Sequence, residues 1–253
     1  MTGVLDAAAA LVAAERFGAL ATVVAGPDLG ASALLDIDRG WEAGSLPVAL
    51  ADPVAADAVA LVSRELSRTL AYDDYDVFIE AIVPRPHLVI FGAVHIGQEL
   101  CAIGRRMGFH VTVADARPAF TTPERFPEAD VLLVGWPDQV EVEFDRRTHV
   151  VVLSHDARFE DPLWPRVLDS PAAYVGAMGS RKTVARRRRK LEAAGFTEAA
   201  IDRIHGPIGL PIGAETPAEV AVAILAEITA NRYRPDQPLE LIGQDRPGAL
   251  GGG

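Results

Sequence analysis

The sequence predicts an α/β protein in which a Rossmann-like parallel-sheet domain, residues 87–234, follows a smaller N-terminal α+β domain, residues 1–83. After residue 87, short and almost wholly apolar runs alternate with stretches of helical periodicity, which indicates parallel strands buried on both faces. A glycine-bearing turn follows the first apolar run, as in Rossmann domains. Between the two domains stands Pro84-Arg85-Pro86, a stiff segment without helix potential.

The N-terminal domain mixes helical and strand-like segments. Residues 3–16 are rich in alanine and predict a helix. Two short β-type runs follow, at Ala19–Ala25 and Ala33–Ile37. Asp52–Leu66 places its apolar residues at helical spacing, and Asp76–Val83 alternates as a strand.

The second domain opens on a strand and closes on a helix. Gln98–Met107 is predicted as the first helix, and the capping box Thr216–Glu219 begins a last helix that continues to Ala230. Residues 235–253 carry three prolines and a glycine end, and are predicted to form a flexible tail. The predicted strands are His87–Phe91, Val111–Asp115, Val131–Gly135, Val150–Ser154 and Ala172–Val175.

Composition excludes several classes of protein. With one cysteine among 253 residues, the chain builds neither a disulfide framework nor a multi-cysteine metal site. A net charge of −11 disfavours nucleic acid and anionic membranes as partners. No apolar stretch approaches the ~20 residues of a membrane span, and Asp6 precedes the first base, Arg16, unlike a secretory signal. We therefore expect a cytoplasmic protein.

The first glycine turn is Gly92-Ala93-Val94-His95-Ile96-Gly97. Gly92 permits a tight turn, Gly97 permits a helix to pack closely on the sheet, and the helix start offers N–H groups to a phosphate. Asp115 ends the next strand, where a carboxylate would bind a ribose hydroxyl. Val94, however, stands where a glycine lets a pyrophosphate touch the backbone, which weakens the prediction of NAD(P) binding.

A second glycine turn, residues 175–181, follows a later strand and contains Gly176 and Gly179. Ser180 is a good N-cap for the helix beginning at Arg181, so turn, helix start and arginine together predict an anion site. Seven of the ten residues 181–190 are basic. That run is either a solvated helix face or, with less support, a nucleic-acid contact.

Two further segments hold candidate residues. Residues 205–215 are apolar yet full of turn formers, which predicts an ordered loop over one end of the sheet. His205 in that segment favours a structural role. His155 follows a strand at the edge where α/β sheets bind ligands, so it either binds a ligand or caps the next turn.

Together these motifs resemble the XdhC/CoxI family of accessory proteins for xanthine dehydrogenase and related molybdenum hydroxylases. The resemblance covers about residues 80–232. The Gly-Ser-Arg turn combined with the glycine segment before Thr216 is its most specific part. The matching segments are Phe91–Gly97, Asp115 with Arg117, Arg125–Pro127, Ser154–Asp156, Tyr174–Arg181 and His205–Pro217.

The resemblance implies a chaperone rather than a catalyst. Such proteins bind molybdenum cofactor, a molybdenum–pterin (molybdopterin), assist its sulfuration with a cysteine desulfurase, and deliver it to the apo molybdenum hydroxylase; they are usually homodimers. No catalytic residue and no protein metal ligand is assigned. The residues assigned to cofactor binding are Gly92, His95, Gly97, Asp115, Arg117, His155, Gly176, Gly179, Ser180, Arg181, Gly209, Gly213 and Glu215.

The sequence departs from the family at three places. Val94 replaces a glycine, Pro211 stands where an aspartate is common, and Pro47–Leu50 replaces a segment that often holds a cysteine. The one cysteine, Cys101, falls instead in the first Rossmann helix, where it is expected to pack as a small hydrophobe. Thiolate ligation of molybdenum is therefore not expected.

Two other functions stay open. Gly92, Gly97 and Asp115 support an NAD(P)-binding oxidoreductase, although no proton-transfer pair accompanies them. The divergent N-terminal domain supports a non-catalytic regulatory protein with a vestigial nucleotide site. The substitution Val94→Gly separates oxidoreductase from chaperone, because only the oxidoreductase hypothesis predicts a strong change in NAD affinity.

Overall fold

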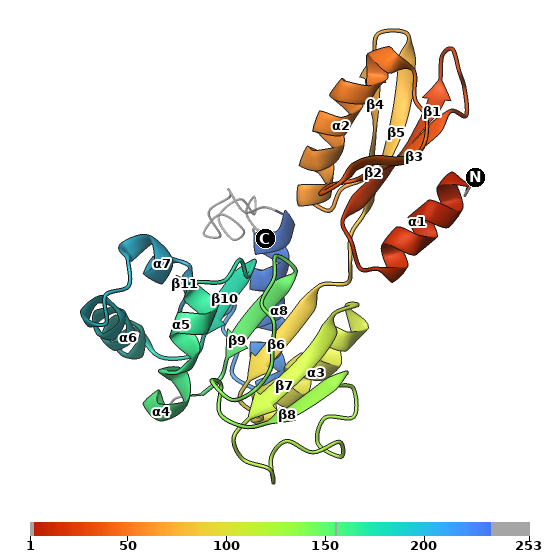
Figure 1. Ribbon diagram of the computed structural model, residues 1–253. Helices are drawn as coiled ribbons and strands as arrows, with labels where there is room; N and C mark the ends of the chain where they lie inside the picture. Colours follow the sequence, from red (N-terminus) through yellow and green to blue (C-terminus); the bar gives the residue numbers. More distant parts are fainter. Residues whose placement is uncertain (1–2, 155, 234–253) are drawn as a thin grey trace, which may run out of the picture. The chain divides into compact units, whose positions relative to one another are not determined.

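The structure is a computed structural model that describes residues 3–154 and 156–233. The chain divides into two compact units, with the division between Arg85 and Pro86 (Figure 1). His155 and residues 234–253, which include the predicted tail, lie outside the described residues. Among those that the structure describes, no helix combines the length and apolar character that crossing a membrane requires.

The N-terminal unit is a five-stranded antiparallel sheet with two helices, α1 (Val4–Ala13) and α2 (Val48–Ser63). Inward-facing Ala19, Ala21 and Val23 alternate along the central strand and pack with apolar residues of α2. In sheet order the strands are β3 (Gly40–Gly44), β2 (Ser32–Asp36), β1 (Gly18–Ala25), β5 (Tyr75–Ile82) and β4 (Arg68–Tyr72).

Two features of this unit differ from the sequence expectation. Helix α2 begins at Val48, ahead of the predicted Asp52, and carries Pro53 inside it. Proline is best tolerated in the first turn of a helix, and Pro53 lies one position after the predicted start. Strands β3 and β4 were not predicted, because both are short, mostly exposed edge strands without an apolar run.

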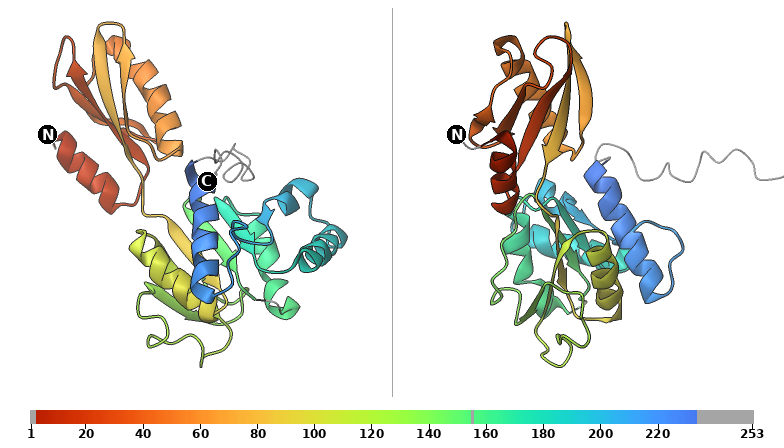
Figure 2. Two further views of the ribbon diagram at one scale, coloured as in Figure 1. Left: turned by 180° about the vertical axis from the view of Figure 1, so that it is seen from behind. Right: turned by 90° about the vertical axis from the view of Figure 1, so that its right-hand side faces the viewer.

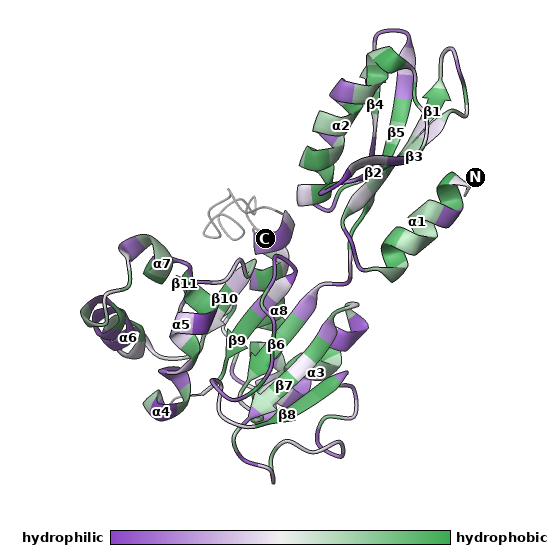
Figure 3. Cartoon of the chain, viewed as in Figure 1, coloured by the Kyte–Doolittle hydropathy of each residue, from purple (hydrophilic) through white to green (hydrophobic). Residues whose placement is uncertain are grey.

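The second unit is a six-stranded, wholly parallel sheet, so the predicted α/β Rossmann-like class is confirmed. Ile90 of the central strand lies opposite Val113 on one side and Val151 on the other. The central strands are mostly apolar, with polar residues chiefly near their ends (Figure 3). In sheet order they are β11 (Ile204–His205), β10 (Tyr174–Ala177), β9 (Thr148–Val152), β6 (His87–Phe91), β7 (His110–Asp115) and β8 (Val131–Val134).

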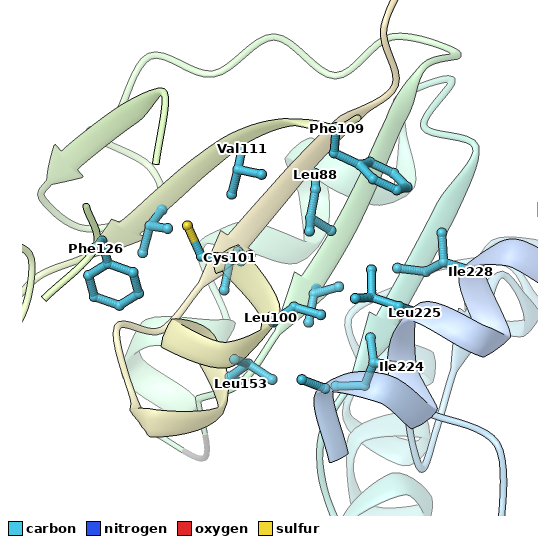
Figure 4. Packing of buried hydrophobic residues seen from close by; sticks show 14 of the residues in the cluster. Leu88, Leu100, Cys101, Phe109, Val111, Phe126, Leu153, Ile224, Leu225 and Ile228 are labelled. Carbon is cyan, nitrogen blue, oxygen red and sulfur yellow. The ribbon is translucent and has the colours of Figure 1, made fainter. Parts of the chain in front are cut away.

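Helices cover both faces of this sheet. Helices α3 (His95–Arg106) and α8 (Pro217–Tyr233) lie side by side on one face (Figure 2). Their Leu100, Ile224 and Ile228 join Leu88 and other strand residues in one buried cluster (Figure 4). The other face is covered by α5 (Leu163–Leu168), preceded by the single-turn α4 (Ala157–Glu160). Helices α6 (Arg181–Ala193) and α7 (Glu198–Asp202) follow β10.

Strand order fixes where a ligand site belongs. The chain builds β6, β7 and β8 outward in one direction, then returns to place β9 on the other side of β6 and continues outward through β10 to β11. The order therefore reverses between β6 and β9. In open α/β sheets ligands bind at the carboxyl ends of the strands beside such a reversal.

Several bounds moved relative to the predicted elements. Strand β9 starts at Thr148 rather than Val150, and β10 occupies Tyr174–Ala177 rather than Ala172–Val175. The short elements α4, α5, α7 and β11 were not predicted, because a segment of two to six residues shows too little periodicity. The capping box at Thr216 formed: the Glu219 carboxylate accepts from the N–H of Thr216 at 2.9 Å.

Candidate functional site

A cleft of about 430 Å³ opens at the carboxyl edge of the sheet, beside the reversal in strand order. Its walls come from the ends of β6, β7 and β9, from the segment after β8, and from α4. It combines apolar side chains with two acid and two base side chains. The lining residues are Val94, Asp115, Ala116, Arg117, Trp136, Leu153, Ser154, Asp156, Arg158 and Phe159.

The first glycine turn contributes Val94 to the lining of this cleft. Gly92 has a φ of +120°, a conformation that favours glycine, and is fully buried. A Cβ on Gly97 would lie 2.8 Å from the Gly92 carbonyl oxygen, so only glycine lets α3 pack this close to β6. Both glycines therefore have the conformational roles that the sequence predicted, and neither lines the cleft itself.

The carboxylate of Asp115, at the end of β7, is bound by the first glycine turn and by Arg117. Its Oδ2 accepts from the Ala93 N–H at 2.8 Å and from Arg117 Nη2 at 2.8 Å. Its Oδ1 accepts from Arg117 N and Nε, both at 2.9 Å. Because a carboxylate has about four acceptor positions, this one is saturated by the protein. A ribose hydroxyl would have to displace one of these donors.

The electrostatics of Asp115 follow from these contacts. Burial, the largest single influence, acts to raise the pKa of Asp115, but the hydrogen bonds from Arg117 and Ala93 together outweigh it and leave the pKa below its ordinary value. The Arg117 side chain is half exposed, and its pKa is raised by the hydrogen bond to Asp115. An ionised pair thus stands at the mouth of the cleft.

Val94 is the N-cap residue of α3 and lines the cleft. No side chain caps this helix, so its first-turn N–H groups have no side-chain acceptor. They can bind an anion, as predicted for this turn. His95 begins the helix and is exposed. The valine side chain occupies the position where a glycine would leave room for a pyrophosphate, which is the departure noted in the sequence.

A second cleft, of about 590 Å³, lies between α4, α5 and α6. Its buried centre is the ion pair of Arg187 with Glu160, at 3.0 Å, and Arg187 also donates to the Met178 carbonyl oxygen at 2.9 Å. These contacts bind α6 to α4 and to the second glycine turn. Asp156 lines both clefts, so the two adjoin along the same edge of the sheet.

The glycines and cap of the second turn serve local packing. A Cβ on Gly176 would lie within 2.6 Å of Ile208 and Tyr174 side-chain atoms, and Gly179 packs on Thr183. Ser180 accepts from the Thr183 N–H at 3.2 Å and caps α6, as predicted. Neither cleft is lined by Gly176, Gly179, Ser180 or Arg181.

A sequence model of the XdhC Rossmann domain matches residues 88–228, which is more than half of the chain and includes every element around both clefts. The chain belongs to the XdhC family. Three curated bacterial proteins are similar to it in sequence. One of them, from Bacillus subtilis, is named as a probable subunit of xanthine dehydrogenase. It is 34% identical over 161 residues, covering 63% of this chain and 47% of that protein.

The other relatives are from Escherichia coli. A protein named YqeB is 35% identical over 153 residues, 60% of this chain and 28% of its own length. The molybdenum cofactor insertion chaperone PaoD is 28% identical over 102 residues, 40% of this chain and 32% of its own. The chain thus spans less than half the length of each of these relatives.

A solved structure of similar fold is a xanthine dehydrogenase from Bacillus halodurans. The TM-score is 0.53 at 17% identity, and the superposition covers 93% of this chain and 98% of that one. At this identity the likeness concerns the fold alone. It extends over the N-terminal unit as well as the XdhC Rossmann domain.

In the described part of this XdhC-family chain, three of the seven basic residues of the α6 run form ion pairs with acidic side chains. Arg188 pairs with Glu192, Glu198 and Asp202 at 3.0, 3.2 and 2.5 Å. Lys190 pairs with Asp161 at 2.5 Å, and Arg187 is buried with Glu160. These partners favour the solvated-face interpretation of the run over a nucleic-acid contact.

The glycine-rich segment 205–215 is hydrogen-bonded to Glu227, a buried glutamate of α8. Glu227 accepts from the Gly209 N–H at 2.7 Å and from the Tyr174 hydroxyl at 2.6 Å, and lies 3.3 Å from His205. Gly209 has a φ of +95° and packs on the α8 backbone. Gly213 and Glu215 are exposed. His205 therefore has the structural partner that its interpretation favoured.

Sequence reasoning missed Glu227, Glu160 and Arg187 as organising residues. Glu227 could have been noticed, because it is an acid on the apolar face of α8 beside Ile224 and Ile228. The partnership of Glu160 with Arg187 left no local signal, since the two stand 27 positions apart.

Of the residues assigned to cofactor binding, the structure brings Asp115 and Arg117 together in the first cleft. His155 lies outside the described residues, although its neighbour Asp156 caps α4 through the Arg158 N–H. The described part of the chain holds no group of three metal-ligating side chains. Cofactor contact by each assigned residue remains a prediction.

Proposed function

We propose that this chain is an accessory protein of molybdenum hydroxylases that binds molybdenum cofactor as cargo and assists its maturation and insertion. The XdhC Rossmann domain supports this proposal, as does the relative PaoD, which is named a molybdenum cofactor insertion chaperone. The observation that carries the proposal is the cleft at the strand-order reversal, which lies wholly within the matched domain.

The chemistry of the cleft suits this cargo. A molybdenum–pterin offers a reduced heterocyclic ring system, a phosphate and an anionic metal centre. The uncapped start of α3 and the Arg117 guanidinium supply donors for the anionic groups. Trp136 and Phe159 supply aromatic surface in the same cleft. The cleft therefore matches both the charge and the ring of the cargo.

The thiol of this chain is not suited to hold molybdenum or to accept sulfur. Cys101 is fully buried in the core beneath α3 (Figure 4). Burial raises the pKa of its thiol to about 12, so the thiolate that a metal or a sulfur transfer needs is scarce. In this proposal sulfur comes from a cysteine desulfurase, and the apo-hydroxylase receives the cargo. The proposed setting is the cytoplasm, and the proposed assembly is a homodimer.

The test is the content of protein purified anaerobically from a host that makes molybdenum cofactor. Oxidation to fluorescent pterin, elemental molybdenum and released nicotinamide nucleotide are measured on one sample. The proposal predicts pterin and molybdenum in near-equal amounts, approaching one per chain. Nucleotide without pterin would contradict it.

A second candidate is an NAD(P)-binding protein, either an oxidoreductase or a regulator with a vestigial site. Gly92, Gly97 and the Rossmann strand order favour it. The saturation of Asp115 disfavours an unphosphorylated ribose there. Val94→Gly is its test: a strong gain in NAD affinity supports nucleotide binding, whereas an unchanged, negligible affinity supports the chaperone.

A further inference from the structure

The first cleft is lined by an arginine, Arg117, that has hydrogen-bond donors available for a ligand. Arg117 has five side-chain N–H donors, and two of them, on Nε and Nη2, bind Asp115. Among the described residues the other three make no hydrogen bond. The guanidinium lines the cleft, and its side chain is 51% exposed, so these donors are accessible to a bound molecule.

The position of this guanidinium is fixed from two directions. Asp115 holds it through two parallel N–H···O bonds, and its Cζ lies 4.2 Å from the centre of the Phe120 ring. Arg125 lies over the same ring at 4.9 Å and donates to the Ala93 carbonyl oxygen. Preorganisation of this kind lowers the entropy that a ligand loses on binding.

The local charge favours an anion. Around Phe120 two guanidiniums, of Arg117 and Arg125, face one carboxylate, that of Asp115. The remaining charged pair in the cleft, Arg158 with Asp156, is internally balanced at 2.7 Å. On a chain whose net charge is −11, this excess of positive charge is a local exception.

The strand end occupied by Asp115 decides ligand chemistry in Rossmann sheets. A free carboxylate there binds the two hydroxyls of a ribose, whereas a nearby arginine binds a phosphate carried at that place. In this chain the carboxylate is saturated and the arginine retains donors. We propose that Arg117 is the recognition residue of a phosphomonoester subsite, so that the cleft selects ligands bearing a terminal phosphate over the same ligands without it.

The ligand has two sources: the phosphate of a pterin cargo, or the 2′-phosphate of an adenine nucleotide. The first source, the pterin cargo, depends on the function proposed above, whereas the second source, the nucleotide, does not. Both ligands present a phosphomonoester of charge near −2, which a guanidinium can bind through two N–H groups.

The experiment compares ligand pairs that differ by one phosphate. Oxidised pterin released from molybdenum cofactor is titrated before and after phosphatase treatment, and NADP+ is titrated against NAD+, which carries no phosphomonoester. We expect at least one pair to show a tenfold or greater preference for the phosphorylated member. Arg117→Gln abolishes that preference, and Arg117→Lys, which keeps the charge without the fork, retains part of it.

The matched control is Arg105→Gln, a partly exposed arginine that pairs with Asp130 and does not line this cleft. It should keep the preference, while circular dichroism confirms that all three variants fold. Because Arg117→Gln also frees the Asp115 oxygens, NAD+ should bind this variant more tightly than the wild type.

The outcomes separate this inference from the proposed function. No preference in either pair, or a preference that survives Arg117→Gln, overturns the subsite even if the purified protein contains pterin. A preference confined to the nucleotide pair, in protein that contains no pterin, supports the subsite and contradicts the cargo proposal. A preference in the pterin pair that depends on Arg117 supports both.

Discussion

The two glycine turns of the Rossmann unit look alike in sequence and differ in what surrounds them. The first turn, after β6, contributes Val94 to a cleft and is bound by Asp115, whose partner Arg117 keeps free donors. The second turn, after β10, is bound by Arg187, which is buried with Glu160. Both turns were predicted as anion sites, but they differ in the arginine of the ion pair: Arg117 at the first turn is half exposed, whereas Arg187 at the second is buried.

A glycine turn and a helix start therefore do not by themselves define a binding site. The charged residue that binds the turn decides whether donors remain for a ligand. At the second turn the glycines are required by neighbouring side chains, and the cap is filled by Ser180. Its ion pair is therefore expected to contribute mainly to stability, and that of the first turn mainly to binding.

The largest expected effect follows from breaking the buried pair at the second turn. Glu160→Gln leaves the Arg187 guanidinium buried without its counter-charge, which typically costs about 3–5 kcal/mol of unfolding free energy. Chemical denaturation followed by tryptophan fluorescence measures this, since Trp164 lies 5.4 Å from the Arg187 guanidinium. The double variant Glu160→Leu with Arg187→Met should cost less than the single one; an equal or larger loss would contradict this assignment.

Removing the carboxylate at the first turn should have a smaller effect on stability. Asp115→Asn weakens charge-assisted hydrogen bonds that are each worth about 1.5–3 kcal/mol, but its partner Arg117 remains half exposed and keeps its hydration. We expect a loss near the lower end of that range. A loss larger than that of Glu160→Gln would reverse the comparison between the turns.

The same substitution changes the response to acid. The pKa of Asp115 is lower in the folded chain than its ordinary value, so the unfolded chain takes up the proton first as the pH falls. The stabilisation is present above the unfolded pKa of about 3.9 and is lost as the pH drops through the lower folded pKa. Unfolding free energy measured from pH 6 to pH 2 should therefore fall less steeply in Asp115→Asn; identical slopes would show that the carboxylate is not stabilised.

A Cβ at the second turn tests whether its glycine is there for packing. Gly176→Ala places a methyl group within 2.6 Å of Ile208 and Tyr174 side-chain atoms, and such overpacking typically costs about 1–3 kcal/mol. Gly213→Ala is the control, because the space around that glycine is open and only its φ of +78° is strained. Equal losses in the two variants would remove the packing argument.

The smallest expected effect concerns the cap of α6. Ser180→Ala removes the hydroxyl that accepts from the Thr183 N–H, at a cost of about 1 kcal/mol. Ligand binding in the first cleft should not change, because Ser180 does not line it. Loss of pterin from Ser180→Ala would restore the second turn as an anion site.

Sequence reasoning predicted the Rossmann strands well, since β6, β7 and β9 are continuous apolar runs that can only be buried. It missed β3, β4 and β11, whose residues are exposed or too few to show a period. It placed Asp115 at the correct strand end. It could not show that Arg117, two residues later, saturates that carboxylate, because side-chain geometry is not visible in a motif.

We propose that the cleft at the strand-order reversal holds the molybdenum–pterin cargo. The most direct measurement is the pterin content of protein purified anaerobically from a cofactor-producing host, for the wild type and two tryptophan variants. Ser154→Trp fills the first cleft, and Ala194→Trp fills the second. We expect pterin in the wild type and in Ala194→Trp and little in Ser154→Trp; full retention by Ser154→Trp would show that the cargo is not held in the first cleft.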